Sequence, residues 1–230
     1  MKRILTGVLL AGLLLSSCNK DETLYYNITE MGVVQNGKII SDSGMTYTIV
    51  ESSGQFDLTS LDRILFYCDV LRANGENAYE IRLNNLYPIQ KLDIVPAAGL
   101  PEQQPDHPVY VNAAWFGGGF LNLNLNFFTK DGSKVEHKFT LAAGEIPTAA
   151  GDTLRLRLYH DAADEYWDGS VELSGTGYVS NGTYVSFPLS DYLPASGTRP
   201  LKITYLWHTY EDGYIVSPTK EYAIKGDLVR

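Results

Sequence analysis

Residues 121–127 are Leu121-Asn122-Leu123-Asn124-Leu125-Asn126-Phe127, in which apolar and amide side chains alternate strictly. Successive side chains of a β-strand point to opposite faces, so the alternation predicts a strand with a buried leucine face and a solvated asparagine face. Such one-sided strands are typical of antiparallel sheets. The stretch therefore predicts a protein built on antiparallel β-sheet.

The same pattern recurs along the chain. Residues 154–159 alternate leucines with arginines that we expect to point outward, and residues 203–210 suit a third such strand. Asn-Gly or Asp-Gly pairs favour the tight turns of β-hairpins, and they occur at 36–37, 74–75, 131–132, 181–182 and 212–213. No long run has helical spacing, and only 58–61 and 190–193 suit single turns. These signals together predict an all-β fold.

A proline-rich segment divides the predicted strands into two groups, because Pro96, Pro101, Pro105 and Pro108 interrupt any strand there. The five candidates before it suit a small OB-like barrel. They lie at about 29–40, 45–51, 63–72, 78–86 and 89–95. The candidates after it suit an immunoglobulin-like β-sandwich, although the Cys…Trp…Cys pattern of antibody domains is absent. We expect a barrel at 29–95, a linker at 96–108 and a sandwich at 109–230.

The N-terminus carries a targeting pattern. Two basic residues precede the apolar run 4–15, which is shorter than the roughly 20 residues of a membrane-spanning helix. The run ends in Leu15-Ser16-Ser17-Cys18, which resembles the lipobox of bacterial lipoproteins. The resemblance implies a signal peptide at 1–17, a lipid on Cys18 and a charged tether at 18–28. The alternative is an ordinary cleaved secretory signal with an incidental cysteine.

The residues after Cys18 suggest an address. Asn19 is not the aspartate of an inner-membrane retention signal, and Lys20-Asp21-Glu22 resembles the tether that exports some Bacteroidetes lipoproteins to the cell surface. We therefore expect an outer-membrane location, lipid-anchored and facing outward. Loss of residues 1–17 changes the formal charge from −9 to −11, which argues against a nucleic-acid partner and leaves membrane attachment to the lipid.

The second cysteine, Cys68, has no partner if Cys18 is lipidated. It lies in an apolar run, Ile64 to Leu71, so a buried inert thiol is expected rather than a reactive one. The core is then expected to hold without a disulfide.

A family resemblance rests on the lipobox and on three further segments: Gly32–Gly37, Asp62–Phe66 and Asp152–Tyr159. A lipoprotein signal, an OB-like barrel and a β-sandwich in this order resemble the NigD-like proteins of Bacteroidetes, over nearly the whole mature chain. The resemblance implies no catalytic residue and no cofactor. The family name comes from a bacteriocin-associated locus, which implies a role in immunity for its members.

Residues 161–168 form the one dense cluster of carboxylate and aromatic side chains in the sequence. Asp161, Asp164 and Trp167 are candidate ligand contacts there, for calcium or a carbohydrate, and the alternative is a solvated acidic loop whose tryptophan folds onto the sandwich edge. The glycines of 115–120 indicate a bulge or a close backbone approach. Thr153 matches a weak O-glycosylation pattern, and the four histidines lack the spacing of a zinc site.

Three hypotheses of function follow. The first is a non-catalytic lipid-anchored lipoprotein that binds a protein or glycan at the cell envelope. The second is a protective lipoprotein of the bacteriocin-immunity type. The third is a carbohydrate hydrolase that uses carboxylates such as Asp161, Asp164 or Glu165. The first is preferred because the chain shows no nucleophile elbow, P-loop or other catalytic set.

Overall fold

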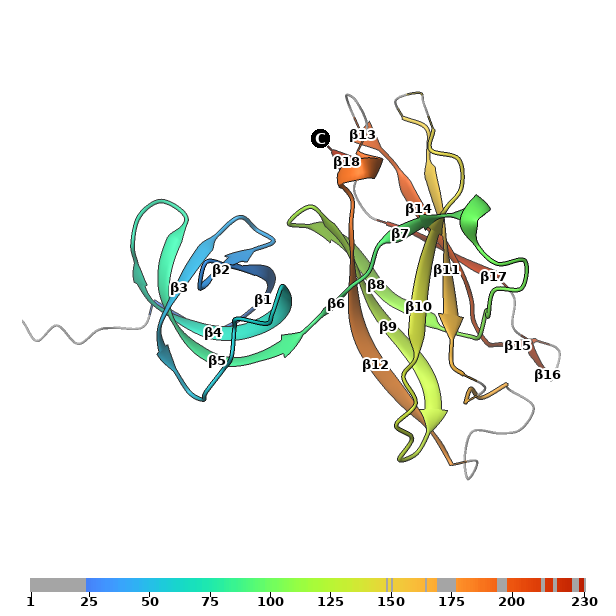
Figure 1. The fold of residues 1–230 in the computed structure, drawn as a ribbon, viewed down its shortest axis with the longest axis horizontal. Coiled ribbons are helices and arrows are strands. Elements are labelled where there is room, and N and C mark those ends of the chain that lie inside the picture. The colour runs from blue at the N-terminus through green and yellow to red at the C-terminus, as the bar shows by residue number, and fades with distance from the viewer. Residues whose placement is uncertain are drawn as a thin grey trace, which may run out of the picture.

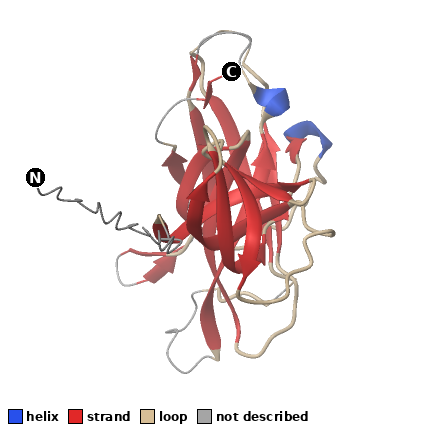
Figure 2. Ribbon diagram, turned by 90° about the vertical axis from the view of Figure 1, so that its left-hand side faces the viewer, coloured by secondary structure: helices blue, strands red, loops and turns tan. Residues whose placement is uncertain are grey.

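The computed structural model describes residues 24–147, 149, 151–163, 165–168, 177–193, 198–211, 214–216, 219–224 and 228–229. These residues form an N-terminal barrel and a C-terminal β-sandwich, which lie side by side in Figure 1. Apart from two short 3₁₀ turns, the regular structure of the described residues is β-strand, as Figure 2 shows. The prediction of an all-β fold is confirmed. No helix in the described part of the chain is long and apolar enough to cross a membrane.

The barrel closes with five strands in the order β1-β2-β3-β5-β4. They are β1 (Tyr25–Gln35), β2 (Lys38–Ser41), β3 (Thr46–Ser52), β4 (Arg63–Ala73) and β5 (Ala78–Pro88). Strand β1 pairs antiparallel with β4 and closes the barrel, while β3 pairs parallel with β5. The predicted number of barrel strands is therefore correct. The predicted Asn36-Gly37 hairpin is also confirmed, since both residues have positive φ between β1 and β2.

The barrel core follows the two-residue period of β4. Ile64, Phe66, Cys68 and Val70 point inward and are almost completely buried. Cys68 is a free buried thiol, and burial raises the pKa of this thiol to about 12. Only the thiolate is nucleophilic, so the expectation of an inert core cysteine is supported.

The sandwich consists of two facing sheets. One has the order β17-β14-β11-β10-β7 and the other β6-β12-β9-β8. The first contains β7 (Ile94–Pro96), β10 (Lys138–Ala143), β11 (Leu154–Asp161), β14 (Leu201–Leu206) and β17 (Thr219–Ala223). The second contains β6 (Gln90–Lys91), β8 (Tyr110–Gly117), β9 (Phe120–Lys130) and β12 (Tyr178–Pro188).

Smaller elements complete the C-terminal part. They are the hairpin of β15 (Thr209–Glu211) with β16 (Tyr214–Val216), the pair of β13 (Thr198–Arg199) with β18 (Leu228–Val229), and the turns η1 (Ala97–Gly99) and η2 (Ser190–Tyr192). The β15–β16 hairpin and η2 lie where the sequence predicted them. The strand predicted at 203–210 begins earlier and ends at Leu206.

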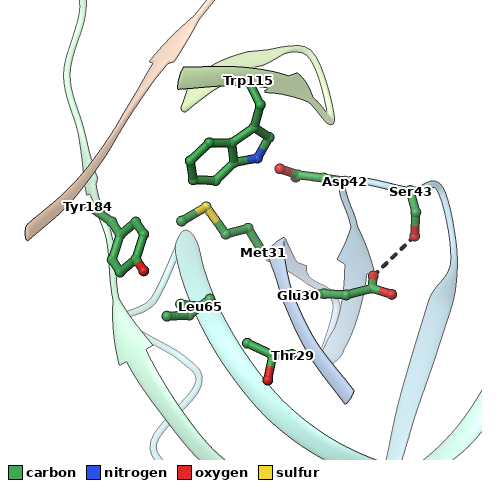
Figure 3. Close-up of a pocket in the computed structure, with 8 residues that line it drawn as sticks. All are labelled: Thr29, Glu30, Met31, Asp42, Ser43, Leu65, Trp115 and Tyr184. Carbon is green, nitrogen blue, oxygen red and sulfur yellow. Dashed lines mark hydrogen bonds between the residues drawn. The ribbon is translucent and has the colours of Figure 1, made fainter. Parts of the chain in front are cut away.

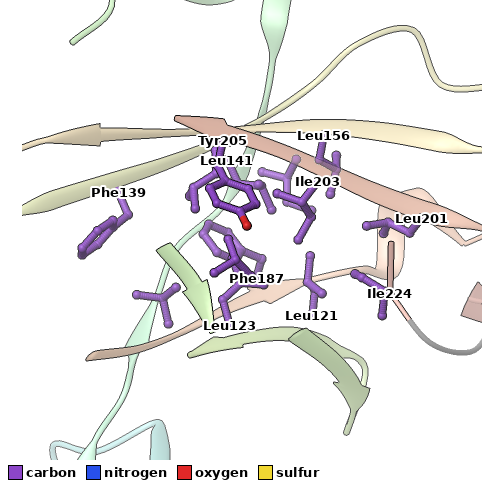
Figure 4. Packing of buried hydrophobic residues seen from close by; sticks show 14 of the residues in the cluster. Leu121, Leu123, Phe139, Leu141, Leu156, Phe187, Leu201, Ile203, Tyr205 and Ile224 are labelled. Carbon is purple, nitrogen blue, oxygen red and sulfur yellow. The ribbon is translucent and has the colours of Figure 1, made fainter. Parts of the chain in front are cut away.

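Leucines from the opposing sheets interdigitate in the sandwich core. Leu121, Leu123 and Phe187 from one sheet face Leu156 and Ile203 from the other (Figure 4). The inward direction of the leucines in residues 121–127 is confirmed, and Arg155 of β11 points to solvent as expected.

Two strand predictions are wrong. Residues 89–95 do not complete the barrel, because β6 pairs parallel with β12 and β7 pairs parallel with β10 of the sandwich. The fifth barrel strand comes instead from the segment 29–40, which the Asn36-Gly37 turn splits in two. Asn181-Gly182 does not form a hairpin turn either: both residues lie within β12 and pair with β9.

A third difference concerns the asparagine face of β9, which was expected to be solvated. Asn122 is completely buried, because the barrel packs against this face of the sandwich. That packing creates the site described next.

Candidate functional site

The junction between barrel and sandwich is built around Arg63, the first residue of β4. Its side chain is completely buried, and the Asp42 side chain that faces it is only 15% exposed. The guanidinium donates from Nη1 to Asp42 Oδ1 at 2.5 Å and from Nη2 to Asp42 Oδ2 at 2.6 Å. This two-pronged geometry is the strongest that an arginine and a carboxylate can form.

Arg63 also reaches across to the sandwich. It donates to Asn122 Oδ1 at 2.8 Å and to Ser186 Oγ at 3.2 Å, and its guanidinium lies 4.4 Å from the centre of the Phe120 ring. Asn122 donates in turn to Asp42 at 3.0 Å. We call Arg63, Asp42, Asn122 and Ser186 the junction network. Because every member bonds another member, the network fixes the two domains against each other.

The glycines after Trp115 make room for this contact. A Cβ atom at Gly118 would lie 2.5 Å from Asp42 Oδ1, and one at Gly117 would lie 2.7 Å from Asp42 Oδ2. The N–H of Gly118 donates to the carbonyl oxygen of Asp42 at 3.2 Å. The predicted close backbone approach is therefore confirmed, and its partner is the barrel.

A groove opens beside the junction network. Its first depression has a volume of about 410 Å³. Trp115 and Tyr184 of the sandwich and Glu30 and Asp42 of the barrel point into it (Figure 3). Thr29, Met31, Ser43 and Leu65 complete the lining.

A second depression of about 360 Å³ adjoins the first, because Leu65 and Tyr184 line both. It adds Tyr67, Tyr87 and Thr183 to the walls. We call the two depressions together the junction groove. Aromatic rings alternate there with hydroxyl and carboxylate groups, as in sites that hold a ligand by stacking and hydrogen bonding.

Glu30 is held in place at one wall of the groove. Its carboxylate accepts hydrogen bonds from Ser43 Oγ at 3.1 Å and from the Tyr47 hydroxyl at 3.2 Å. Burial and the neighbouring carboxylate raise the pKa of Tyr47, so this phenol stays protonated and acts as the donor. The groove therefore offers a fixed hydrogen-bond acceptor to a ligand.

None of the described residues among 161–168, where candidate contacts were predicted, lines the junction groove. Trp167 is 91% buried, and its ring packs on Phe128 and His208 with centroid distances of 5.1 and 4.8 Å. Asp161 accepts from the N–H of Ala163 at 2.9 Å, and Glu165 accepts from Ser133. Trp167 therefore packs onto the sandwich, as the alternative interpretation of this loop predicted. Asp164 lies outside the described residues.

Other predicted features remain predictions. Cys18 and residues 18–23 of the predicted tether lie outside the described residues, and Thr153 precedes β11 with its side chain partly exposed. The tether bounds of 18–28 are wrong at their C-terminal end, because β1 begins at Tyr25 and pairs with β4 of the barrel. Nowhere in the described ranges do three or more His, Cys, Asp or Glu side chains gather as metal ligands would.

The sequence pointed to the Asp62–Phe66 strand and to the glycines of 115–120, but it did not predict that these two segments lie together at the junction. A lone arginine at the start of an apolar strand, Arg63, was the available signal, because a buried arginine requires a carboxylate partner.

Comparisons with known proteins agree with this architecture. A family model for the NigD-like C-terminal beta sandwich domain matches residues 100–224, which is more than half of the chain. The curated proteins give no match.

Solved structures of similar fold include a NigD-like immunity protein from Bacteroides caccae, at 20% identity and TM-score 0.58, covering 88% of this chain and 97% of that one. Another is a candidate lipoprotein from Bacteroides fragilis, at 16% identity and TM-score 0.59, covering 87% and 98%. A protein of unknown function from Bacteroides vulgatus has 17% identity and TM-score 0.57, covering 87% and 92%. On the strength of the family model, the chain belongs to the NigD-like family, with residues 100–224 forming its β-sandwich domain.

Proposed function

We propose that this protein is a non-catalytic lipoprotein of the outer membrane, anchored by lipid on Cys18 and facing outward, that binds a protein or glycan ligand in the junction groove. The observation that carries the proposal is the groove itself. Its walls come from two domains that the buried junction network holds in register. A site whose walls are fixed before binding loses little conformational entropy on binding.

The groove residues favour binding over catalysis. Asp42 is engaged by Arg63, and Glu30 is engaged by Ser43 and Tyr47, so both carboxylates already serve as acceptors. Trp115 and Tyr184 face each other edge to face with ring centres 6.4 Å apart and offer aromatic surface to a ligand. Aromatic side chains of this kind dominate the energy of recognition surfaces.

Binding is tested by applying the mature chain to a glycan array and to solubilised envelope fractions. The variant pair Trp115→Ala and Tyr184→Ala is compared with Tyr110→Ala, an exposed tyrosine on β8 outside the groove. We expect the groove variants to lose at least about tenfold in affinity, equivalent to about 1.4 kcal/mol each, and the control to bind as the wild type does. Equal binding by all variants would reject the groove.

Anchoring is tested separately. Cys18→Ser is expected to abolish incorporation of radiolabelled fatty acid and to release the protein from the membrane fraction. Protease treatment of intact cells is expected to degrade the wild type. Complete protection from protease would reject the outward orientation while leaving the groove untouched.

A role in bacteriocin immunity is the second candidate function. It is favoured by the similar fold of the NigD-like immunity protein from Bacteroides caccae. In that case the ligand in the groove is a bacteriocin or its receptor. Deletion of the gene is expected to raise killing by at least one member of a bacteriocin panel, and Trp115→Ala is expected to fail to restore protection. Unchanged sensitivity across the panel would reject this role.

A further inference from the structure

Strand β12, which lies on the side of the sandwich that faces the barrel (Figure 1), is covered along only part of one edge. At one edge it pairs with β9 along its whole length. At the other edge β6 pairs with Val185 and Ser186, and the chain before β6 leaves for the barrel, where the N–H of Ile89 donates to the Arg63 carbonyl oxygen at 2.9 Å. No strand in the described parts of the chain pairs with residues 179–184 at this edge, which we call the free edge of β12.

The backbone groups that face the free edge follow from the contact with β6. The Ser186 carbonyl oxygen accepts a hydrogen bond from the N–H of Leu92 at 3.0 Å, so Ser186 directs its backbone groups away from β9. The direction of these groups alternates along a strand, with both groups of one residue on the same side. Ser180 and Gly182 therefore also direct their N–H and C=O groups to the free edge, and both residues are exposed. They offer two donors and two acceptors in a row.

The outer strands of the two sandwich sheets carry features that hinder pairing with another strand, but the free edge does not. Strands β6 and β7 are two and three residues long, and β7 ends in Pro96. Strand β17 carries Lys220 beside a glutamate, and β8 contains a bulge. Short strands, charges, prolines and bulges are the means by which natural edge strands avoid unwanted pairing. Residues 179–184, Val-Ser-Asn-Gly-Thr-Tyr, contain no charge and no proline, and their pairing with β9 continues without a bulge. The free edge is therefore suited to accept a further strand.

A depression lies on each face of the sheet beside the free edge. On the barrel side, Gly182 lines the second depression of the junction groove, of about 360 Å³, together with Tyr67 and Tyr87. On the opposite face, Asn181 lines a depression of about 210 Å³, and Thr183 lines both. A strand added to this edge directs successive side chains to opposite faces, so alternate side chains enter the two depressions. Hydrogen bonds along an edge and pockets for alternate side chains are the features by which proteins bind a peptide as an added strand.

Charge distinguishes between a second copy of this chain and a different partner. The formal charge of the chain is −9, and −11 without residues 1–17, so two copies bring like charges together. Among the described residues that line the two depressions, Glu136 is the one charged group. These charges favour an uncharged or basic segment of another polypeptide over a second copy.

We propose that the free edge of β12 binds an extended, uncharged or basic segment of another polypeptide as an added β-strand. The segment forms backbone hydrogen bonds with Ser180 and Gly182, and its alternate side chains occupy the depressions on the two faces. The inference rests on the proposed function, because one of these depressions belongs to the junction groove. It narrows that function to recognition of a protein rather than a glycan.

The probe is a phage-displayed library of random linear peptides, selected on the immobilised mature chain. Ser180→Pro removes an N–H from the free edge and keeps the pairing with β9, because proline is tolerated where its missing N–H would face solvent. Ser180→Ala is the matched control, since it removes the hydroxyl and keeps the N–H. We expect the selected peptides to bind the wild type and Ser180→Ala equally and to bind Ser180→Pro at least about tenfold more weakly. Equal urea midpoints of the two variants show that Ser180→Pro is folded.

Amide hydrogen exchange of the wild type, followed by NMR, tests the edge without any variant. In the free protein the amides of Ser180 and Gly182 are expected to exchange faster than those of Asn181 and Thr183, which face β9. A bound peptide is expected to slow Ser180 and Gly182 and to leave the other two unchanged. Slow exchange of all four amides in the free protein would show that the edge is already covered and would overturn the proposal.

Further outcomes separate this inference from the proposed function. Trp115 lines the first depression alone, so Trp115→Ala is expected to leave the peptide affinity unchanged. If the selected peptides bind Ser180→Pro as they bind the wild type, or lose affinity only in Trp115→Ala, the free edge is not their site and the inference fails while the groove stands. If the library yields no binder but a glycan binds in a Trp115-dependent manner, the inference again fails alone. Self-association of the chain that Ser180→Pro abolishes would assign the edge to a second copy and overturn it equally.

Discussion

Arg63→Met tests the junction network, since methionine fills a similar volume and removes all donors of the guanidinium. In the variant, Asp42 loses both bonds from Arg63, and Asn122 and Ser186 lose one each. The carboxylate is then left at the junction with no cation beside it. We expect the barrel and sandwich to lose the contact that fixes them together.

The magnitude follows from the burial of the pair. Removing one member of a buried ion pair costs about 3–5 kcal/mol, because the other charge stays desolvated. Asp42 is 15% exposed and keeps its bond from Asn122 at 3.0 Å, so we expect the lower end, about 3 kcal/mol. For a chain of this size that loss lowers the Tm by roughly 6–12 °C.

The assay is urea unfolding followed by tryptophan fluorescence and circular dichroism. Arg155→Met is the matched control, because Arg155 is 67% exposed and its pair with Glu221 is expected to contribute less than about 1 kcal/mol. The double variant Arg63→Met/Asp42→Leu is expected to recover part of the loss, since it removes the stranded charge. If Arg63→Met unfolds at the same urea concentration as Arg155→Met, the junction network does not hold the domains together.

Three further outcomes are expected. Gly118→Ala places a Cβ 2.5 Å from Asp42 Oδ1 at a φ of +58° and is expected to lower the free energy of unfolding by about 1–3 kcal/mol in urea titrations, whereas an unchanged value would contradict the close approach. The pKa of His160 is lowered to about 4, so above pH 6.5 neither folded nor unfolded protein binds a proton there, and as the pH falls toward 4 the unfolded state binds it first. Stability should therefore fall by about 3 kcal/mol over that window, and His160→Gln should flatten the slope; equal slopes would refute the neutral buried imidazole. Cys68 is expected to react with a thiol reagent only as fast as the protein unfolds, and rapid labelling of the native protein would contradict its burial.

The sequence predicted side-chain directions correctly where the two-residue period of a β-strand alone sets them. Alternation placed the leucines of residues 121–127 inward and the arginines of 154–159 outward, because a strand has only two faces. It could not show what covers the second face. Asn122 is polar and fully buried, and it is accommodated because Arg63 and Asp42, each more than fifty residues earlier in the chain, hydrogen-bond to its side chain.

Predictions from short sequence motifs were wrong where pairing with a strand distant in the sequence determined the local structure. Asn181-Gly182 favours a turn by itself, yet eleven residues of β12 pair continuously with β9 and extend the strand through it. His137 and His160 lie 23 residues apart, at no recognisable ligand spacing, and meet because β10 and β11 are paired strands. Their contact could therefore not be predicted before the register of these strands was known.

Ligand binding in the groove that the junction network fixes is tested by hydrogen–deuterium exchange with and without the ligand recovered from the array or envelope fraction. Binding in the groove predicts slower exchange in Thr29–Met31, at Asp42 and Ser43, and around Trp115 and Tyr184, with no change in residues 161–168. Protection confined to 161–168, with an unchanged groove, would contradict it.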